Sequence, residues 1–488
     1  MTTHRFGIWT RPLSVLVLLC AIGTFHIATM RRGHDWGGDF ALYILNAKNL
    51  VEGRGYSSDP WIYNPQYPGL SPAKYPPVFP LLTAPVYSAF GLDLEAMKVL
   101  VVLTLLFSLL TLFLFLGGRT SFATAFTIVA LTGFNPLIWH LTIQIRPEFL
   151  FLGLTFLTLY AHGRFEGKMG IGVAPAIGAL TYIVYATRSV GMVLAAAIVI
   201  HEVLKRPINI RYIAAFIMTF ALLVVLQNLA IPDISSYNRM FYLDTGLIAH
   251  NLSQYFAAMS YFWDNGFVRW FSWALTAVFL VAGLFGYIRR VRAGREPLEV
   301  FTALYIVTII IWPYYEMRLL IPLIPLILFY ALYWTSSLKT SWVRVAVPVL
   351  IALTMASYST KYMFVDYSPL REGVHKAESL DLFRFVRSKL PGDATILFAK
   401  PRVLALFTER KSTGVLLPAS DEEIEDVLKT FDVSYVILSR WSAPDTRYML
   451  PFVMRHKARF HLIYANKDFK VLKMETVRAA APVAVVRR

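Results

Sequence analysis

The sequence predicts a mainly α-helical membrane protein of about eleven transmembrane helices with external amphipathic helices, followed by a small soluble α/β domain. Of the 488 residues, 57% are hydrophobic and 15% are aromatic. The mean hydropathy of +0.54 lies far above that of soluble domains. Apolar runs near the ~20 residues needed to cross a bilayer recur as far as Tyr362. The predicted domains are therefore 1–363 in the membrane and 364–488 outside it.

Charged breaks divide the apolar part of the chain into individual spans. The run from Met169 to Leu204 is too long for one crossing, and Arg188 in its middle would be costly at the bilayer centre. We therefore expect a hairpin with Arg188 at its tip. The predicted spans are 13–30, 96–116, 121–138, 149–163, 169–187, 189–204, 212–230, 270–288, 298–313, 319–335 and 343–361.

Lysine and arginine clusters occur in every second connection between these spans. The positive-inside rule assigns those connections to the cytoplasm. The amino terminus is then cytoplasmic, and the carboxy-terminal domain is external. The first span has a basic flank but no small-x-small cleavage site, so we expect a retained anchor. The single cysteine, Cys20, lies inside it and excludes an intramolecular disulfide. A bacterial inner membrane with a periplasmic terminal domain fits these features best.

Two external loops are long enough to contribute to a site. After Asp39, apolar residues recur at helical spacing as far as Val51 with polar residues between them, which predicts an interfacial amphipathic helix ended by Gly53 and Gly55. The loop 231–269 carries a second apolar stripe, which could line a groove for a lipid tail or pack on the protein's own helices. This stripe consists of Leu252, Tyr255, Phe256, Met259, Phe262 and Trp263.

Beyond about Val365, strand-like runs alternate with polar helical stretches, which predicts the α/β domain. The expected strands are 395–399, 434–438 and 469–473, and the expected helices are 380–390 and 421–430. Ser420 and Glu423 form a capping-box pattern before the second helix. The basic excess of this segment suits an anionic membrane surface or an acidic glycan. Nothing in it resembles a nucleic-acid-binding module, so no nucleic-acid partner is expected.

The first external loop contains the clearest candidate site residues. Asp39 follows Gly37-Gly38, and Lys74 opens the run Lys74-Tyr75-Pro76-Pro77-Val78-Phe79-Pro80. A carboxylate and an ammonium group at a bilayer surface suggest chemistry on a lipid-borne phosphate, so we expect a membrane enzyme.

The order of these motifs resembles the integral-membrane glycosyltransferases of the GT-C superfamily. More narrowly, it is similar to bacterial relatives of the protein mannosyltransferase and lipid A aminoarabinose transferase family (Rgt-like glycosyltransferases). The run from Arg318 to Pro325 and the terminal domain extend the resemblance over nearly the whole chain. It implies a sugar donor on polyprenyl phosphate, used on the external face with inversion. The implied acceptor is a glycan, glycolipid or protein of the cell envelope.

The resemblance also implies roles for particular residues. Lys74 matches a lysine that binds the lipid phosphate, Glu148 a second carboxylate of the site, and Tyr43 and Tyr75 substrate contacts. The chemistry of the residues agrees with such a site. An attacking hydroxyl loses a proton, for which Asp39 is the expected general base. The leaving phosphate requires positive charge, and Arg318 and Arg188 are the further candidates for it.

Each of these residues also has a structural explanation. Asp39 could cap the helix that follows it, and Lys74 could be an interfacial lysine with its ammonium in water. Glu148 complements the positive end of a helix dipole. Arg188 and Arg318 could form structural ion pairs with Glu148 and Glu316.

The sequence assigns no definite cofactor. The chain has no Asp-x-Asp pair, which disfavours a nucleotide-sugar donor. Asp39 and Glu148 could hold Mg²⁺ or Mn²⁺, as a divalent ion is used in the oligosaccharyltransferase branch of the superfamily. The principal alternative function is a polytopic transporter or lipid-linked-sugar flippase, although the ionisable residues gather at the outer edge instead of the bilayer midplane. A third alternative function is that of an assembly scaffold without enzymatic activity.

Overall fold

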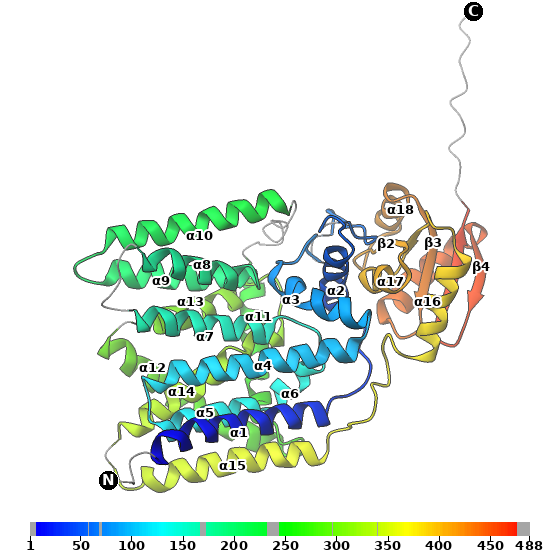
Figure 1. Ribbon diagram of the computed structural model, residues 1–488. Helices are drawn as coiled ribbons and strands as arrows, with labels where there is room; N and C mark the ends of the chain where they lie inside the picture. The colour runs from blue at the N-terminus through cyan, green and yellow to red at the C-terminus, as the bar shows by residue number, and fades with distance from the viewer. Residues whose placement is uncertain are drawn as a thin grey trace, which may run out of the picture. The chain divides into compact units, whose positions relative to one another are not determined.

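A computed structural model describes residues 6–56, 58–67, 71–165, 172–231, 244–294, 296–338 and 340–475 (Figure 1). The chain forms two compact units. The first is Met1–Arg32 with Tyr75–Pro369, and the second is Gly33–Lys74 with Leu370–Arg488. Residues 33–74 thus belong with the carboxy-terminal segment, whereas the sequence-based division placed them in the domain 1–363. The physical reason is the burial of a helix from this loop against the carboxy-terminal segment.

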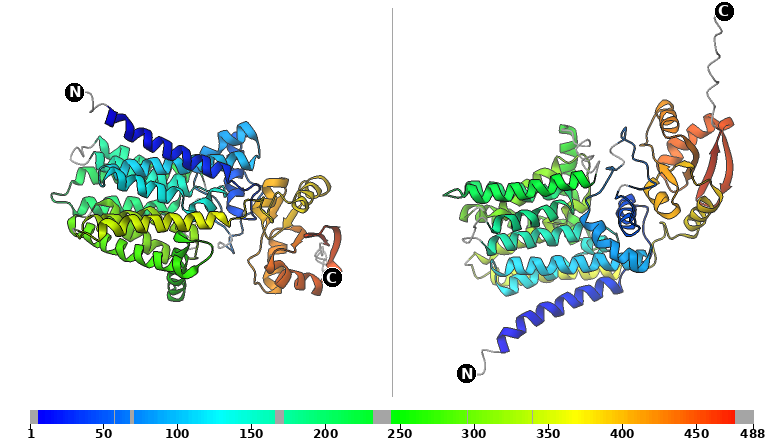
Figure 2. Two further views of the ribbon diagram at one scale, coloured as in Figure 1. Left: turned by 90° about the horizontal axis from the view of Figure 1, so that it is seen from below. Right: turned by 45° about the horizontal axis from the view of Figure 1, so that its top comes forward.

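The first unit is helical, and its helices run side by side (Figures 1 and 2). Among the described residues, each of the eleven predicted spans contains helical structure. The elements are α1 (Phe6–Ala28), α3 (Val78–Phe90), α4 (Leu94–Gly117), α5 (Phe122–Gly133), α6 (Pro136–Thr142), α7 (Glu148–Arg164), α8 (Val173–Tyr185), η2 (Ser189–Gly191), α9 (Met192–Leu204), α10 (Ile210–Ala230), α11 (Thr245–Met259), η4 (Ser260–Trp263), α12 (Arg269–Ala293), α13 (Pro297–Ile310), η5 (Met317–Leu320), α14 (Leu323–Ser336) and α15 (Val343–Met363).

Six helices within the described ranges are long and apolar enough to cross a membrane. The number is seven if α5 and α6, bent by 53°, are taken as one span. Asn135 explains the bend, because its side-chain oxygen caps α6 at Leu137 N and Pro136 follows at the first helical position. Helices α3, α8, α13 and the combined η2 and α9 are apolar but shorter. The count of eleven crossings therefore stays a prediction.

Close packing explains how two of these helices associate. A Cβ atom at Gly286 of α12 would lie 1.9 Å from the carbonyl oxygen of Tyr330 in α14. Only glycine allows this approach of the two backbones. The hairpin expected at Arg188 is also present, since this residue lies between α8 and η2. In the second apolar stripe, Tyr255, Phe262 and Trp263 are buried, while Leu252 and Phe256 are exposed. Packing inside the protein thus accounts for half of that stripe.

The second unit is an α/β domain with a mixed five-stranded sheet of order β2-β1-β3-β5-β4. Strand β1 pairs parallel with β2 and β3, whereas β5 pairs antiparallel with β3 and β4. The three expected strands and both expected helices are present, and the capping box of Ser420 and Glu423 forms. The elements are α2 (Gly38–Val51), α16 (Ala377–Lys389), β1 (Thr395–Leu397), α17 (Pro401–Thr408), β2 (Lys411–Thr413), α18 (Asp421–Thr430), β3 (Val433–Ser439), η6 (Asp445–Met449), α19 (Leu450–Arg455), η7 (Lys457–Arg459), β4 (Phe460–Ala465) and β5 (Phe469–Met474).

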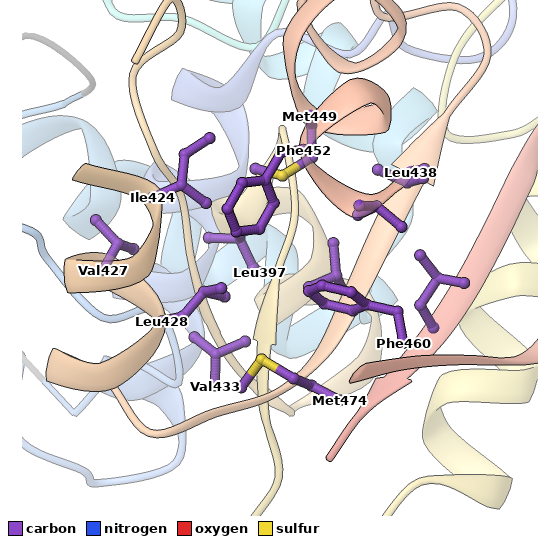
Figure 3. Close-up of a cluster of buried hydrophobic side chains, with 13 residues drawn as sticks. Leu397, Ile424, Val427, Leu428, Val433, Leu438, Met449, Phe452, Phe460 and Met474 are labelled. Atoms are coloured by element: carbon purple, nitrogen blue, oxygen red, sulfur yellow. The ribbon is translucent and has the colours of Figure 1, made fainter. Parts of the chain in front are cut away.

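One face of this sheet is covered by α18 and α19, whose apolar side chains form a core with the strands (Figure 3). Helix α2 packs against α17. The expected polar face of α2 is not at a surface, because Asn46, Lys48 and Asn49 are at most 7% exposed. Asn49 and Asn46 donate to Asp59, and Lys48 pairs with Glu409. These partners satisfy polar groups that burial would otherwise leave unpaired. Helix α2 ends at Val51, and Gly53 has a φ of 66°.

Candidate active site

Asp39 lies in the first turn of α2 but does not cap it. The helix begins at Gly38, and its N-cap residue Gly37 makes no side-chain cap hydrogen bond. The Asp39 carboxylate instead accepts a hydrogen bond at Oδ1 from Nη1 of Arg402, at 3.2 Å. Both side chains are largely shielded, at 16% and 12% exposure. The structure therefore replaces the capping explanation with an ion pair inside the second unit.

Gly38 makes room for this ion pair. A Cβ atom at residue 38 would lie 2.6 Å from Nη2 of Arg402. Any side chain there would push the guanidinium away, since real Cβ contacts are not this short. The physical reason for glycine before Asp39 is thus the arginine that lies over the start of α2.

Lys74 is paired with a buried carboxylate and does not extend into water. Its ammonium donates to Oδ2 of Asp59 at 2.6 Å, and the Asp59 side chain is fully buried. Asn49 donates to the other carboxylate oxygen at 2.8 Å. Asp59 therefore joins α2 to the end of the loop that carries Lys74.

Glu148 is the centre of an arginine cluster in the first unit. It begins α7, and its side chain is only 4% exposed. Arg188 pairs with Oε1, and Nη1 of Arg318 lies 3.5 Å from the same oxygen. Arg146 acts on this carboxylate electrostatically as well. Oε2 has no hydrogen-bond partner within the described ranges. Arg318 also contacts Glu316, from Nε to Oε2 at 3.3 Å. The pairings considered for Arg188 and Arg318 are therefore present.

The remaining sequence-derived candidates are buried. Tyr43 in α2 and Tyr75 are each 4% exposed. Tyr75, Glu148, Arg188 and Arg318 belong to the first unit, and Asp39, Tyr43 and Lys74 to the second. Sequence reasoning missed Arg402 and Asp59. Arg402 lies 363 residues from Asp39, and nothing local marks such a partner. A signal for Asp59 did exist, because an expected helix with Asn46 and Asn49 on one face needs an acceptor when it is buried.

Lys400, at the start of α17, is the other charged group near Asp39. Burial lowers its pKa, and Arg402 lowers it further by repulsion, whereas Asp35, Asp39 and Asp445 oppose the shift. Within the described part of the chain, no carboxylate lies within ion-pair distance of its ammonium. The charge of Lys400 is therefore held by several carboxylates at longer range.

The arrangement of carboxylates at each site does not fit a bound metal ion. Asp39 is paired with Arg402, and Glu148 is surrounded by arginines. Among the described residues there is no group of three or more His, Cys, Asp or Glu side chains that could hold one. Cations next to a carboxylate oppose binding of a divalent ion.

Comparison with known proteins defines the class of fold. Neither family models nor curated protein sequences match this chain. Solved structures do match, and they are GT-C glycosyltransferases, so the resemblance inferred from the sequence is confirmed for the fold. At this level of identity the similarity establishes the fold alone. With its apolar helices, the chain is a multi-pass membrane protein.

Three of these structures show the extent of the similarity. ArnT from Cupriavidus metallidurans, bound to undecaprenyl phosphate, has a TM-score of 0.58 and 13% identity over 96% of this chain and 99% of its own. The Archaeoglobus fulgidus oligosaccharyltransferase complex with Zn and sulfate has a TM-score of 0.61 and 12% identity, over 87% and 68%. Mycobacterial arabinofuranosyltransferase AftD has a TM-score of 0.55 and 13% identity, over 94% of this chain but 40% of its own.

Proposed function

We propose that this protein is a membrane glycosyltransferase that transfers a sugar from a polyprenyl-phosphate donor, with inversion. The acceptor is a glycan, lipid or protein of the cell envelope, and transfer takes place on the external face of a bacterial inner membrane. The similarity in fold to ArnT, solved with undecaprenyl phosphate, supports this donor class.

The arginine cluster around Glu148 is the observation that carries the proposal. Three guanidinium groups, from Arg146, Arg188 and Arg318, act on one buried carboxylate. Guanidinium groups gathered in shielded surroundings suit a phosphate group, which arginine binds with paired N–H donors. In the proposal this cluster binds the donor phosphate, with Glu148 holding the arginines in place.

Asp39 is the proposed general base. The acceptor hydroxyl gives its proton to the carboxylate as its oxygen attacks the anomeric carbon. The new C–O bond forms while the bond from that carbon to the phosphate oxygen breaks, and polyprenyl phosphate leaves with the electron pair. Attack opposite the leaving group inverts the anomeric carbon. Cations beside the leaving phosphate stabilise the charge that develops there.

Arg402 and Lys74 have supporting parts in this proposal. Arg402 orients the Asp39 carboxylate through the 3.2 Å hydrogen bond. Lys74 contributes positive charge to the donor phosphate, and Asp59 positions its ammonium. Substrate contact by Tyr43 and Tyr75 rests on the family resemblance alone.

The direct test is transfer of radiolabelled sugar from polyprenyl phosphate by the purified protein. We expect label in an endogenous acceptor and loss of transfer with Arg318→Lys, because an ammonium does not reproduce the paired donors of a guanidinium. Arg344→Lys, at an exposed position of α15, is the matched control. Movement of the lipid-linked sugar across vesicles without any transfer would favour the flippase alternative.

A further inference from the structure

A pocket of about 120 Å³ lies beside Asp39, wholly within the second unit. Its lining includes Trp61, Tyr63, Asn64, Tyr67, Lys400 and Arg402. Gly38, which precedes Asp39, lines it as well, and Arg402 contacts the Asp39 carboxylate. The pocket is therefore placed where a substrate could reach the proposed base.

Two buried polar atoms of its lining residues lack hydrogen-bond partners within the described part of the chain. They are Oη of Tyr63 and Nδ2 of Asn64. Buried polar groups are nearly always hydrogen-bonded in folded proteins, and leaving one unpaired costs stability. A ligand with several hydroxyl groups would satisfy both atoms, since each hydroxyl donates and accepts.

The wall that carries these atoms is fixed by its own hydrogen bonds. Trp61 forms a parallel bridge with Ser412 of β2, and Ile62 N donates to Ser412 O at 2.8 Å. The side-chain oxygen of Asn64 accepts from Gln66 N at 2.9 Å, which leaves its NH₂ group as the available donor. The aromatic rings of Trp61 and Tyr63 pack edge to face, 6.0 Å apart. The aromatic rings and hydrogen-bond donors of this wall are thus preorganised, so a ligand would not have to order them.

The charges of the lining residues define the ligand further. Lys400 and Arg402, its charged side chains, are both cations. Arg402 is already paired with Asp39. Lys400 forms no ion pair with any of the described residues. Hydrogen bonds from cations to a carboxylate or phosphate are about twice as strong as neutral ones. An acidic sugar suits this lining. Its ring would pack on the aromatic faces, its hydroxyls would bond the polar atoms, and its acidic group would pair with the cation.

We propose that this pocket binds the acceptor of the transfer, and that the acceptor presents a sugar ring with a carboxylate or phosphate group. The identification of this ligand as the acceptor rests on the proposed function. The sugar ring packs on Trp61 and Tyr67, its hydroxyls bond Tyr63 and Asn64, and its anionic group lies at Lys400.

Ligand-observed NMR on the full-length protein in lipid nanodiscs tests this with three probes. They are methyl glucuronide, glucose 6-phosphate and methyl glucoside, which differ in the acidic group. We expect at least one anionic probe to bind about tenfold or more tightly than methyl glucoside. Lys400→Gln should remove that preference, whereas Arg384→Gln, an exposed arginine of α16, should keep it. A preference for the carboxylate or for the phosphate probe would identify which group the acceptor carries.

Tyr63→Phe gives an independent readout. Because Oη of Tyr63 has no described partner, its removal should leave thermal stability unchanged or higher, while weakening all three probes about three- to tenfold. Equal binding of the neutral and anionic probes would overturn the assignment of an acidic group. Failure of all three probes to bind at millimolar concentration would overturn the pocket itself. The assay reads binding without turnover, so its failure is separable from failure of the proposed transfer.

Discussion

Arg402 of α17 donates a hydrogen bond to Asp39 of α2 at 3.2 Å, across 363 residues of sequence. The two helices pack together, so the first loop and the carboxy-terminal segment fold as one unit. The proposed base therefore takes its orientation from the carboxy-terminal segment and not from its own helix cap.

Asp39→Asn should lower sugar transfer at least about a hundredfold, because an amide cannot take the proton of the acceptor hydroxyl. The amide oxygen can still accept from Arg402, so folding should persist. Turnover is measured with saturating donor, and Asp381→Asn, on the exposed side of α16, serves as the control. A near-normal rate in a folded Asp39→Asn sample would remove Asp39 from the chemistry.

Gly38→Ala should separate Arg402 from Asp39, since the added Cβ would meet Nη2 at 2.6 Å. We expect slower transfer and a lower Tm. The effect should be small in an Arg402→Ala background, because both changes act through one contact. Gly392→Ala, where a Cβ meets no atom within 4 Å, should leave the transfer rate and the Tm unchanged. Fully additive losses in the double variant would show that Gly38 acts in some other way.

Lys74→Met should destabilise the second unit by about 3–5 kcal/mol, because it leaves the fully buried Asp59 carboxylate without its cation. The companion change Asp59→Asn should recover most of that loss. If Lys74 also binds the donor phosphate, the stable double variant should still show a raised KM for the donor. A double variant with both normal stability and normal donor use would make Lys74 purely structural.

The anionic preference of the pocket beside Asp39 should decrease as the pH rises. Burial and repulsion from Arg402 lower the pKa of Lys400 from 10.5, against the opposing effect of Asp35, Asp39 and Asp445. Lysine is charged below its pKa, so the preference is lost as the pH rises through the lowered pKa of Lys400, before pH 10.5 is reached. Titration of glucuronide binding measures this, and Lys400→Arg should shift the loss to higher pH. A preference that persists unchanged above pH 10.5 would exclude Lys400 as its source.

The predicted orientation is tested by reporter fusions. A reporter after Lys361 should be active only outside the cytoplasm, and one after Arg292 only inside, because basic clusters mark the cytoplasmic side. Activity of both on the same side would contradict the eleven-span arrangement and the external position of the terminal domain.

Periodicity in the sequence was sufficient for the local elements. The helix 421–430 with its capping box and the strand at 434–438 were predictable, because each depends on neighbours a few residues away. The resemblance to GT-C enzymes likewise followed from the order of short motifs, and the fold confirms it. The number of crossings stays a prediction, since several helices are shorter than a bilayer requires.

The sequence by itself determined the class of fold, the apolar helices and the candidate residues Asp39, Lys74 and Glu148. Only the tertiary structure decided what each of them contacts. Ion pairs such as Asp39 with Arg402 join residues far apart in the chain, and apolar periodicity carries no information about such partners. Burial also decided the role of the polar residues on α2, because a face that looks solvent-exposed in sequence can be buried once Asp59 supplies the hydrogen-bond acceptor.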